Sequence, residues 1–347
     1  MNALMHESQF PVLWVFTLFY TLLLILPSTS VTPPDLTINV SLLFTVLLPI
    51  LFALYVVGSS AHTNTATSFQ PAWTGTMGNH NFCEEDYKYS QYIAEFHNTW
   101  SSLPIIFYGG VGPYYTRKHA TKELRFSFAF MSIGAIGVGS TLFHGTLLRF
   151  GQVLDEVPML CVIFVGVFCF VENQARPKYG TWFPAALFAT CIGLVAAYLV
   201  FYWYSLFLIA FGGGVVLLLV RGIVVLKHAS QLSATILKVS AVSIVIGFSC
   251  WLIDDQLCGS VQFMRLHIGW HICTGCGGYL FTMFLLTLRA ATLNQEYHLV
   301  VVGLDGQGHW INAEGNYVAI GDRPKFLLPY VEFKAAGESK KKDKKSL

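Results

Sequence analysis

Residues 266–288 read LHIGWHICTGCGGYLFTMFLLTL, and this stretch indicates the class of fold. A helix that crosses a bilayer needs about 20 mostly apolar residues, which this stretch provides. Six more such stretches follow residue 95, at about 97–115, 125–147, 153–171, 182–202, 205–226 and 235–252. The composition agrees, since 54% of the 347 residues are hydrophobic and 12% are charged, against roughly 25% charged in soluble domains. These figures exclude a disordered chain, a disulfide-stapled secreted module and an ordinary soluble enzyme.

The sequence therefore predicts an all-α membrane protein with a bundle of seven transmembrane helices, because each span must satisfy its own backbone groups. Two earlier apolar stretches, at about 10–27 and 39–58, predict an additional N-terminal hairpin. A cleaved signal peptide is one alternative for them, although its basic n-region is missing, and an extension outside the folded core is another. The expected division is an extension at 1–60, a lumenal segment at 61–95, a seven-span core at 96–290 and a cytosolic tail at 291–347.

The basic residues orient the seven spans. Cytosolic loops carry an excess of Lys and Arg. Alternate connections hold most of the basic residues here, namely Arg117, Lys118, Lys122, Arg125, Arg176, Lys178, Lys227 and Arg289, with a lysine run at the end of the chain. The opposite side holds only Lys88, Arg149 and Arg265. We therefore expect a cytosolic C-terminus and a lumenal or extracellular segment at 61–95.

Three histidines stand inside these spans, where ionisable groups are costly and are candidates for function. His267 and His271 are four residues apart on one helix face, and the charge rule places His144 at the same depth on the lumenal side. Three nitrogen ligands with one open position are typical of catalytic zinc, whereas a structural site closes the fourth position with protein. The sequence thus predicts zinc on His144, His267 and His271.

Asp155 is expected at the same depth as the histidines, and Ser140 lies one turn before His144 on the same helix face. Zinc lowers the pKa of a water molecule and polarises a carbonyl, so Asp155 could carry a proton to a leaving amine. Ser140 could donate a hydrogen bond to the developing oxyanion. Two structural alternatives stay open: Ser140 bonded to its own helix, and Asp155 favoured by a helix N-terminus in the first turn of its span.

The lumenal segment is acidic just before the first of the seven spans. It reads NFCEEDY at 81–87, with Glu95 following, and oxygen ligands at uneven spacing suit calcium, although a solvated acidic face is the common alternative. Cys83 and Cys258 are the two cysteines outside the predicted spans. Both are assigned to lumenal loops, where an oxidising environment permits pairing, so we expect a Cys83–Cys258 disulfide.

The chain resembles the alkaline ceramidase family over about residues 75–290. The resemblance rests on four groups of residues in order: Asn81–Tyr87 with Tyr92–Phe96; Gly139–His144; Leu154–Met159; and His267–His271 with Thr274 and Gly275. It implies zinc on the three histidines, with Ser140 and Asp155 assisting. It also implies hydrolysis of the amide of a ceramide-type lipid, within the bilayer, to a sphingoid base and a fatty acid.

The resemblance further implies a calcium site that regulates the enzyme. The matching positions are Asn81, Phe82 through its carbonyl, Glu84, Asp86 and Glu95. Asn81 departs from the acidic residue usual at its position, which removes one negative charge from the site.

Lys344 and Lys345 near the end of the chain resemble a retrieval signal of the endoplasmic reticulum. We therefore expect residence there or in the Golgi. A basic tail attracted to anionic headgroups is the alternative interpretation.

Two other functions stay open at this point: a seven-span receptor or non-catalytic lipid-binding protein, and a related hydrolase that remodels glycolipid anchors. Ser140 and Asp155 beside the histidines favour catalysis, and the calcium-like segment favours a ceramidase.

Overall fold

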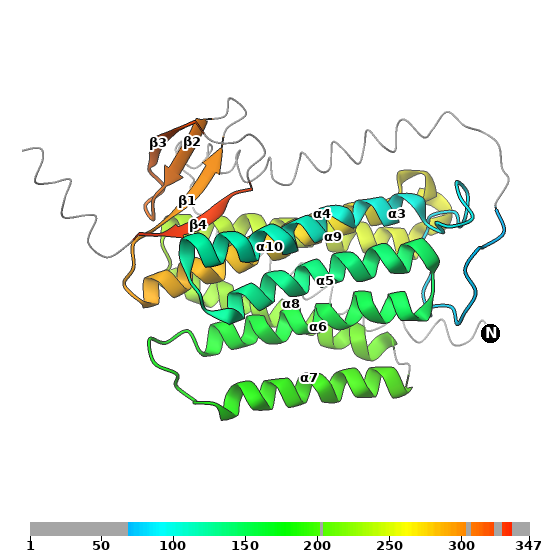
Figure 1. The fold of residues 1–347 in the computed structure, drawn as a ribbon, viewed down its shortest axis with the longest axis horizontal. Helices are drawn as coiled ribbons and strands as arrows, with labels where there is room; N and C mark the ends of the chain where they lie inside the picture. Colours follow the sequence, from blue (N-terminus) through cyan, green and yellow to red (C-terminus); the bar gives the residue numbers. More distant parts are fainter. Residues whose placement is uncertain (1–68, 202–203, 303–306, 323–327, 335–347) are drawn as a thin grey trace, which may run out of the picture.

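The computed structural model describes residues 69–201, 204–302, 307–322 and 328–334. The two predicted N-terminal spans and Lys344 and Lys345 lie outside these residues. The described part is mostly helical, and Figure 1 shows long helices side by side with a small sheet at one end.

The long helices are α5 (Leu124–Thr146), α6 (Arg149–Val171), α7 (Trp182–Phe201), α8 (Tyr204–Val225), α9 (Gln231–Val261) and α10 (His267–Thr292). All six are long and apolar enough to cross a membrane, and successive helices run in opposite directions (Figure 1). We call the end with the first residues of α10 the histidine end and the opposite one the tail end. The chain is thus a multi-pass membrane protein.

The first of the seven expected spans, 97–115, is divided into α3 (Phe96–Ser101) and α4 (Leu103–Tyr115). Pro104 explains the break, because proline lacks the N–H that would continue the helical ladder. The Ser102 hydroxyl bonds back to the carbonyl of Asn98 at 2.9 Å, and its N–H lies 3.4 Å from the carbonyl of Thr99. The two pieces are individually too short to cross a membrane, although Figure 1 shows them in line.

Two helices extend further than the sequence predicts. Helix α6 begins at Arg149, so Asp155 lies in its second turn and not in its first. Helix α9 continues to Val261 across a non-helical residue, Leu257, so Cys258 lies on this helix and not in a loop. In both cases the segment at 69–95 pairs with a buried polar residue of the extended part: the N–H of Asn79 donates to Gln152 on α6, and the N–H of Cys83 donates to Asp254 on α9.

Close packing of α5 and α6 depends on glycine. A Cβ atom on Gly139 would lie 2.1 Å from the carbonyl oxygen of Leu154, and one on Gly151 would lie 2.7 Å from the Cα of Phe143. These distances leave no room for a side chain. The close approach brings Ser140 on α5 toward Asp155 on α6.

The tail end carries a sheet, which the all-helical expectation and the expected simple tail at 291–347 do not include. Its antiparallel strands are β1 (Tyr297–Val302), β2 (Gln307–Ile311), β3 (Tyr317–Asp322) and β4 (Tyr330–Phe333), in the order β3-β2-β1-β4. Apolar residues from one face of the sheet join the core of the helices, among them Leu299, Ile311 and Val331. The Tyr279 hydroxyl of α10 also donates to the carbonyl of Pro329 at 2.7 Å. The sheet is therefore part of the same folded unit.

Residues 69–95 fold over the turn between α5 and α6. Backbone N–H groups of Gly78 and Glu95 donate to the carbonyls of Leu147 and His144 at 2.8 and 2.9 Å. The segment is thereby fixed against the histidine end of the bundle.

Candidate active site

Two helices bring His144, His267 and His271 together at the histidine end. His144 lies in the last turn of α5, and the other two lie in the first two turns of α10. Their candidate ligand atoms all lie within 4.8 Å of one another, and each residue is at most 2% exposed. The expected convergence of the three histidines is therefore present, and it forms a buried site able to hold a metal ion.

Hydrogen bonds fix two of the imidazole rings. His144 bonds through Nδ1 to the carboxylate of Glu95, and His271 bonds through Nδ1 to the hydroxyl of Ser101 at 2.7 Å. Such partners select the ring orientation and leave Nε2 for a metal. Among the described residues, His144 Nε2 and both ring nitrogens of His267 have no hydrogen-bond partner. Buried nitrogens without partners and a three-histidine donor set fit a zinc ion.

Ser140 lies directly against this cluster. Its hydroxyl is 3.2 Å from Nε2 of His271 and 2.9 Å from the hydroxyl of Ser102. The alternative in which Ser140 bonds only to its own helix therefore does not apply. Because Ser102 can supply or accept the second hydrogen bond, Ser140 can orient its hydroxyl toward a ligand at the histidines.

Asp155 faces a cavity of about 50 Å³ that His267 also lines. It is 7% exposed, and its Oδ1 atom has no hydrogen-bond partner within the described part of the chain. A buried acceptor without a partner is costly unless a ligand satisfies it. Asp155 is thus placed to act on a group bound at the histidines.

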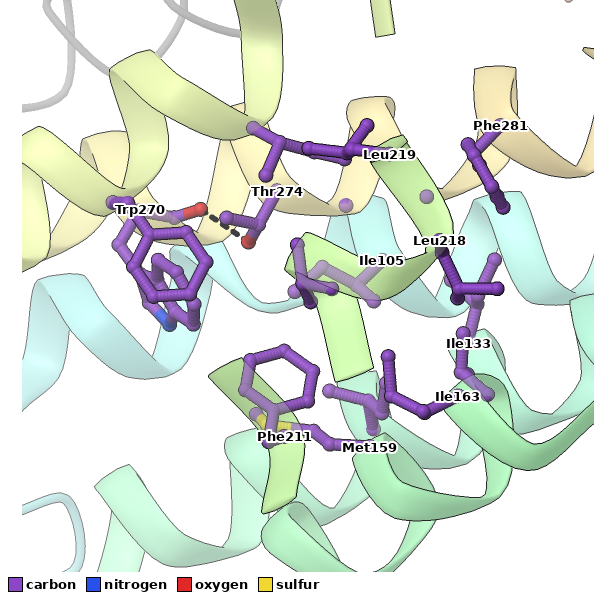
Figure 2. A pocket seen from close by; sticks show the side chains of 17 residues that line it. Ile105, Ile133, Met159, Ile163, Phe211, Leu218, Leu219, Trp270, Thr274 and Phe281 are labelled. Carbon is purple, nitrogen blue, oxygen red and sulfur yellow. Dashed lines mark hydrogen bonds between the residues drawn. The ribbon is translucent and has the colours of Figure 1, made fainter. Parts of the chain in front are cut away.

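A second, apolar cavity of about 100 Å³ continues from the first between the helices. Figure 2 shows apolar side chains from several helices pointing into it, among them Ile163, Leu218 and Phe281. Met159, Phe211, Phe248 and Trp270 line both cavities. A compartment that contains Asp155, Glu156 and His267 therefore adjoins an apolar compartment between the helices.

The expected calcium residues lie together beside the histidines, held mostly by hydrogen bonds. Asn81 donates to Asp86 at 2.9 Å, and the N–H of Phe82 donates to Glu95 at 3.1 Å. Glu84 accepts the N–H groups of His97 and Asn98 at the start of α3, both at 2.9 Å. These bonds compete with any cation for the carboxylate oxygens of Glu84.

Burial changes the acidity of two of these carboxyl groups. Desolvation of the fully buried side chain raises the pKa of Glu95 to about 8, and desolvation also raises the pKa of Asp86. Because desolvation disfavours the ionised form of a carboxyl group, a positive charge beside these two groups would stabilise their ionised forms.

Cys83 and Cys258 form a disulfide, as the sequence predicts. The N–H of Cys83 also donates to the buried carboxylate of Asp254 on α9 at 3.2 Å. The acidic segment is therefore attached to the end of α9 by a covalent bond and a hydrogen bond.

Sequence reasoning did not find the supporting residues of the site. It assigned Glu95 only to calcium, although this residue also contacts His144. It gave no role to Ser101 and Ser102, whose partners come from α10 and α5. The sequence feature that could have identified Ser101 and Ser102 is the pair of adjacent hydroxyl residues in an apolar span shortly before Pro104.

Known proteins were compared with the whole chain. The ceramidase family model matches residues 74–304. The putative alkaline ceramidase dcd3A of Dictyostelium discoideum is 28% identical over 244 residues, which cover 59% of this chain and 84% of that protein. Alkaline ceramidase 3 of Mus musculus is 28% identical over 242 residues, covering 64% and 87%. Alkaline ceramidase YPC1 of Saccharomyces cerevisiae is 30% identical over 262 residues, covering 66% and 82%. With most of its length matched, the chain belongs to the ceramidase family.

Proposed function

We propose that this ceramidase is a zinc-dependent enzyme that hydrolyses the N-acyl amide of ceramide within the membrane. The observation that carries the proposal is the buried group of His144, His267 and His271 beside the cavity that Asp155 lines. Zinc bound there would polarise the amide carbonyl and lower the pKa of a water molecule.

The residues around the histidines have separate roles in this proposal. Glu95 and Ser101 hold the rings of His144 and His271 in the orientation that presents Nε2. Ser140 donates a hydrogen bond to the oxygen that becomes negative when the carbonyl is attacked. Asp155 takes the proton released by the attacking water and gives it to the nitrogen of the departing amine.

The two cavities suit a lipid whose reacting amide is polar and whose chains are apolar. The amide would lie in the compartment of Asp155, and an acyl or sphingoid chain would extend toward Ile163 and Phe281. Both cavities are smaller than the roughly 300–1,000 Å³ of typical ligand pockets, so substrate binding must move the helices apart.

The metal proposal is tested by purifying the protein and measuring zinc content and ceramide hydrolysis together. We expect about one zinc ion per chain, bound by His144, His267 and His271. His271→Ala should lose the zinc and the activity, whereas His119→Ala, which changes a histidine at the tail end, should keep both. Full ceramide hydrolysis by the His271→Ala protein would refute the mechanism.

We also propose that calcium binds the segment of Asn81, Phe82, Glu84, Asp86 and Glu95 and raises the activity. Glu95 supports this coupling, because it contacts both Phe82 of the segment and His144 of the zinc group. Calcium would displace the hydrogen bonds that Glu84 makes to the start of α3 and would compensate the buried charge.

Calcium chelation should therefore reduce turnover, and Glu84→Ala should weaken the response to added calcium. Glu85→Ala is the matched control, since Glu85 is half exposed and pairs with Lys88. If calcium does not change the activity of the unmodified protein, the proposed calcium site is refuted.

We place the tail end in the cytosol and count α3 with α4 as the seventh crossing. The basic residues of the alternate loops support this orientation. With Lys344 and Lys345, it supports residence in the endoplasmic reticulum.

A further inference from the structure

A second carboxyl group lines the cavity beside Asp155, and the proposed mechanism does not use it. Glu156 is the next residue on α6 and is 6% exposed. Its side chain faces the same cavity as Asp155 and His267. A buried carboxyl group at this position requires an explanation, because burial without partners is unfavourable.

One oxygen of Glu156 is held firmly. The side-chain amide of Gln152, one turn earlier on α6, donates to Oε1 of Glu156 at 2.8 Å. The backbone N–H of Asn79 donates to the side-chain carbonyl oxygen of Gln152 at 2.8 Å. Because the N–H of Asn79 can only donate, it fixes the carbonyl of Gln152 toward itself and the amino group toward Glu156.

The other oxygen of Glu156 lies close to the hydroxyl of Tyr198, which is its nearest donor. Among the described residues, neither Oε2 of Glu156 nor this hydroxyl has a partner of good hydrogen-bond geometry. The guanidinium of Arg149 lies over the ring of Tyr198, 5.3 Å from its centre. Glu156 is therefore an anchored carboxyl group whose second oxygen, beside the Tyr198 hydroxyl, can also meet a ligand.

We propose that Oε2 of Glu156 accepts a hydrogen bond from a hydroxyl group of the sphingoid base, which makes Glu156 a specificity-determining residue. This inference rests on the proposed ceramide hydrolysis. Ceramide carries hydroxyl groups on the two carbons that flank the amide-bearing carbon. Asp155 and Glu156 are consecutive residues on the wall of one cavity, so they can reach neighbouring groups of one substrate. The fatty acyl chain has no donor to offer this oxygen.

The first experiment uses the unmodified full-length protein with zinc. It compares kcat/KM for ceramide, 1-deoxyceramide and 3-deoxyceramide with matched acyl chains. A deoxy analogue lacks the hydroxyl donor and leaves the buried acceptor without a partner. The kcat/KM of at least one deoxy analogue should therefore be about tenfold lower than that of ceramide, or lower still. Equal kcat/KM for all three lipids would overturn the proposal without affecting ceramide hydrolysis itself. Failure to hydrolyse any of them would instead count against the proposed function.

The second experiment measures the same ratio in Glu156→Gln. Because Gln152 donates to the position of Oε1, the amide oxygen of the introduced side chain takes that position, and its NH₂ group replaces the acceptor Oε2 by a donor. The preference for ceramide over the analogue should fall by about tenfold, while zinc content stays unchanged. Glu172→Gln, the same change in a buried carboxyl at the other end of α6, should leave the preference unchanged.

Two results would contradict the role of Glu156. An unchanged ratio in Glu156→Gln would show that the hydroxyl binds elsewhere, and an equal loss of kcat on every lipid would indicate a purely structural or proton-transfer role. If Glu156→Gln does not fold, Gln152→Leu leaves the carboxyl group present but unanchored. That variant should lower the same ratio, and an unchanged ratio there would also refute the proposal.

Discussion

At the scale of single residues, Glu95 connects two parts of the site. Its carboxylate accepts the N–H of Phe82 at 3.1 Å and the side-chain amide of Asn98 at 2.9 Å, and it contacts Nδ1 of His144. One side chain therefore connects the acidic segment to one of the three clustered histidines. The sequence places Glu95 among oxygen ligands, but the distance of 49 residues to His144 hides the contact.

Glu95→Gln tests this contact. The amide cannot hold the ring of His144 as the carboxylate does, and losing such a partner typically lowers metal affinity about 10–100-fold. We expect that decrease in a zinc competition titration at fixed calcium, with activity recovered by excess zinc. Glu85→Gln, which changes a half-exposed carboxylate of the same segment, should bind zinc normally. Unchanged zinc affinity in Glu95→Gln would show that Glu95 does not support His144.

At the scale of helices, the contact between α5 and α6 sets the positions of Ser140 and Asp155 relative to each other. Ser140 follows Gly139, and a Cβ at Gly139 would meet the backbone of Leu154 and Asp155 at 2.1–2.4 Å. Backbone atoms cannot move aside as a flexible side chain can. Residue 139 is therefore restricted to glycine for as long as α5 and α6 keep this close approach.

Gly139→Ala should push α5 and α6 apart. Overpacking of this kind typically costs about 1–3 kcal/mol, and the displacement should lower kcat more than it changes zinc content. Thermal unfolding and single-turnover hydrolysis measure the two effects. Gly213→Ala on α8 is the control, since a Cβ there would meet no atom of another described element within 4 Å. Normal stability and activity in Gly139→Ala would contradict the close approach of these helices.

At the scale of the whole molecule, the sheet and the helices share one core. Leu299 of β1 is completely buried, whereas Val318 of β3 is 52% exposed. Since the apolar face of the sheet continues the core of the bundle, the sheet should contribute to the stability of the bundle.

Leu299→Ala should destabilise the entire protein. Removing a fully buried leucine side chain typically costs about 2–5 kcal/mol, because a cavity remains. We expect a lower midpoint for the unfolding of the helices, measured by circular dichroism in detergent, whereas Val318→Ala should change it little. If the helices unfold at the same midpoint in Leu299→Ala, the sheet is a separate unit.

Much of the bundle follows from the sequence by itself. Long apolar stretches predict the helices α5 to α10 within a few residues at most ends, because a bilayer accepts only segments that satisfy their own backbone. The rarity of charge makes the histidines at 144, 267 and 271 stand out, and the alternation of basic loops assigns them one depth. The convergence of the three histidines follows from this common depth. The Cys83–Cys258 disulfide follows from placing both cysteines on the same side as the histidines.

The tertiary structure decided the contacts that make these residues into a site. Sequence periodicity could not show that Glu95 and Ser101 orient the histidines or that Asn79 and Gln152 hold Glu156, since each partnership depends on how elements pack. It also missed the sheet at 297–333, because its strands are only four to six residues long and their pairing depends on contact with the bundle. The apolar composition of the sequence is enough to predict which segments cross the membrane. The contacts between side chains at the helix ends depend on how the helices pack, so only the tertiary structure shows them.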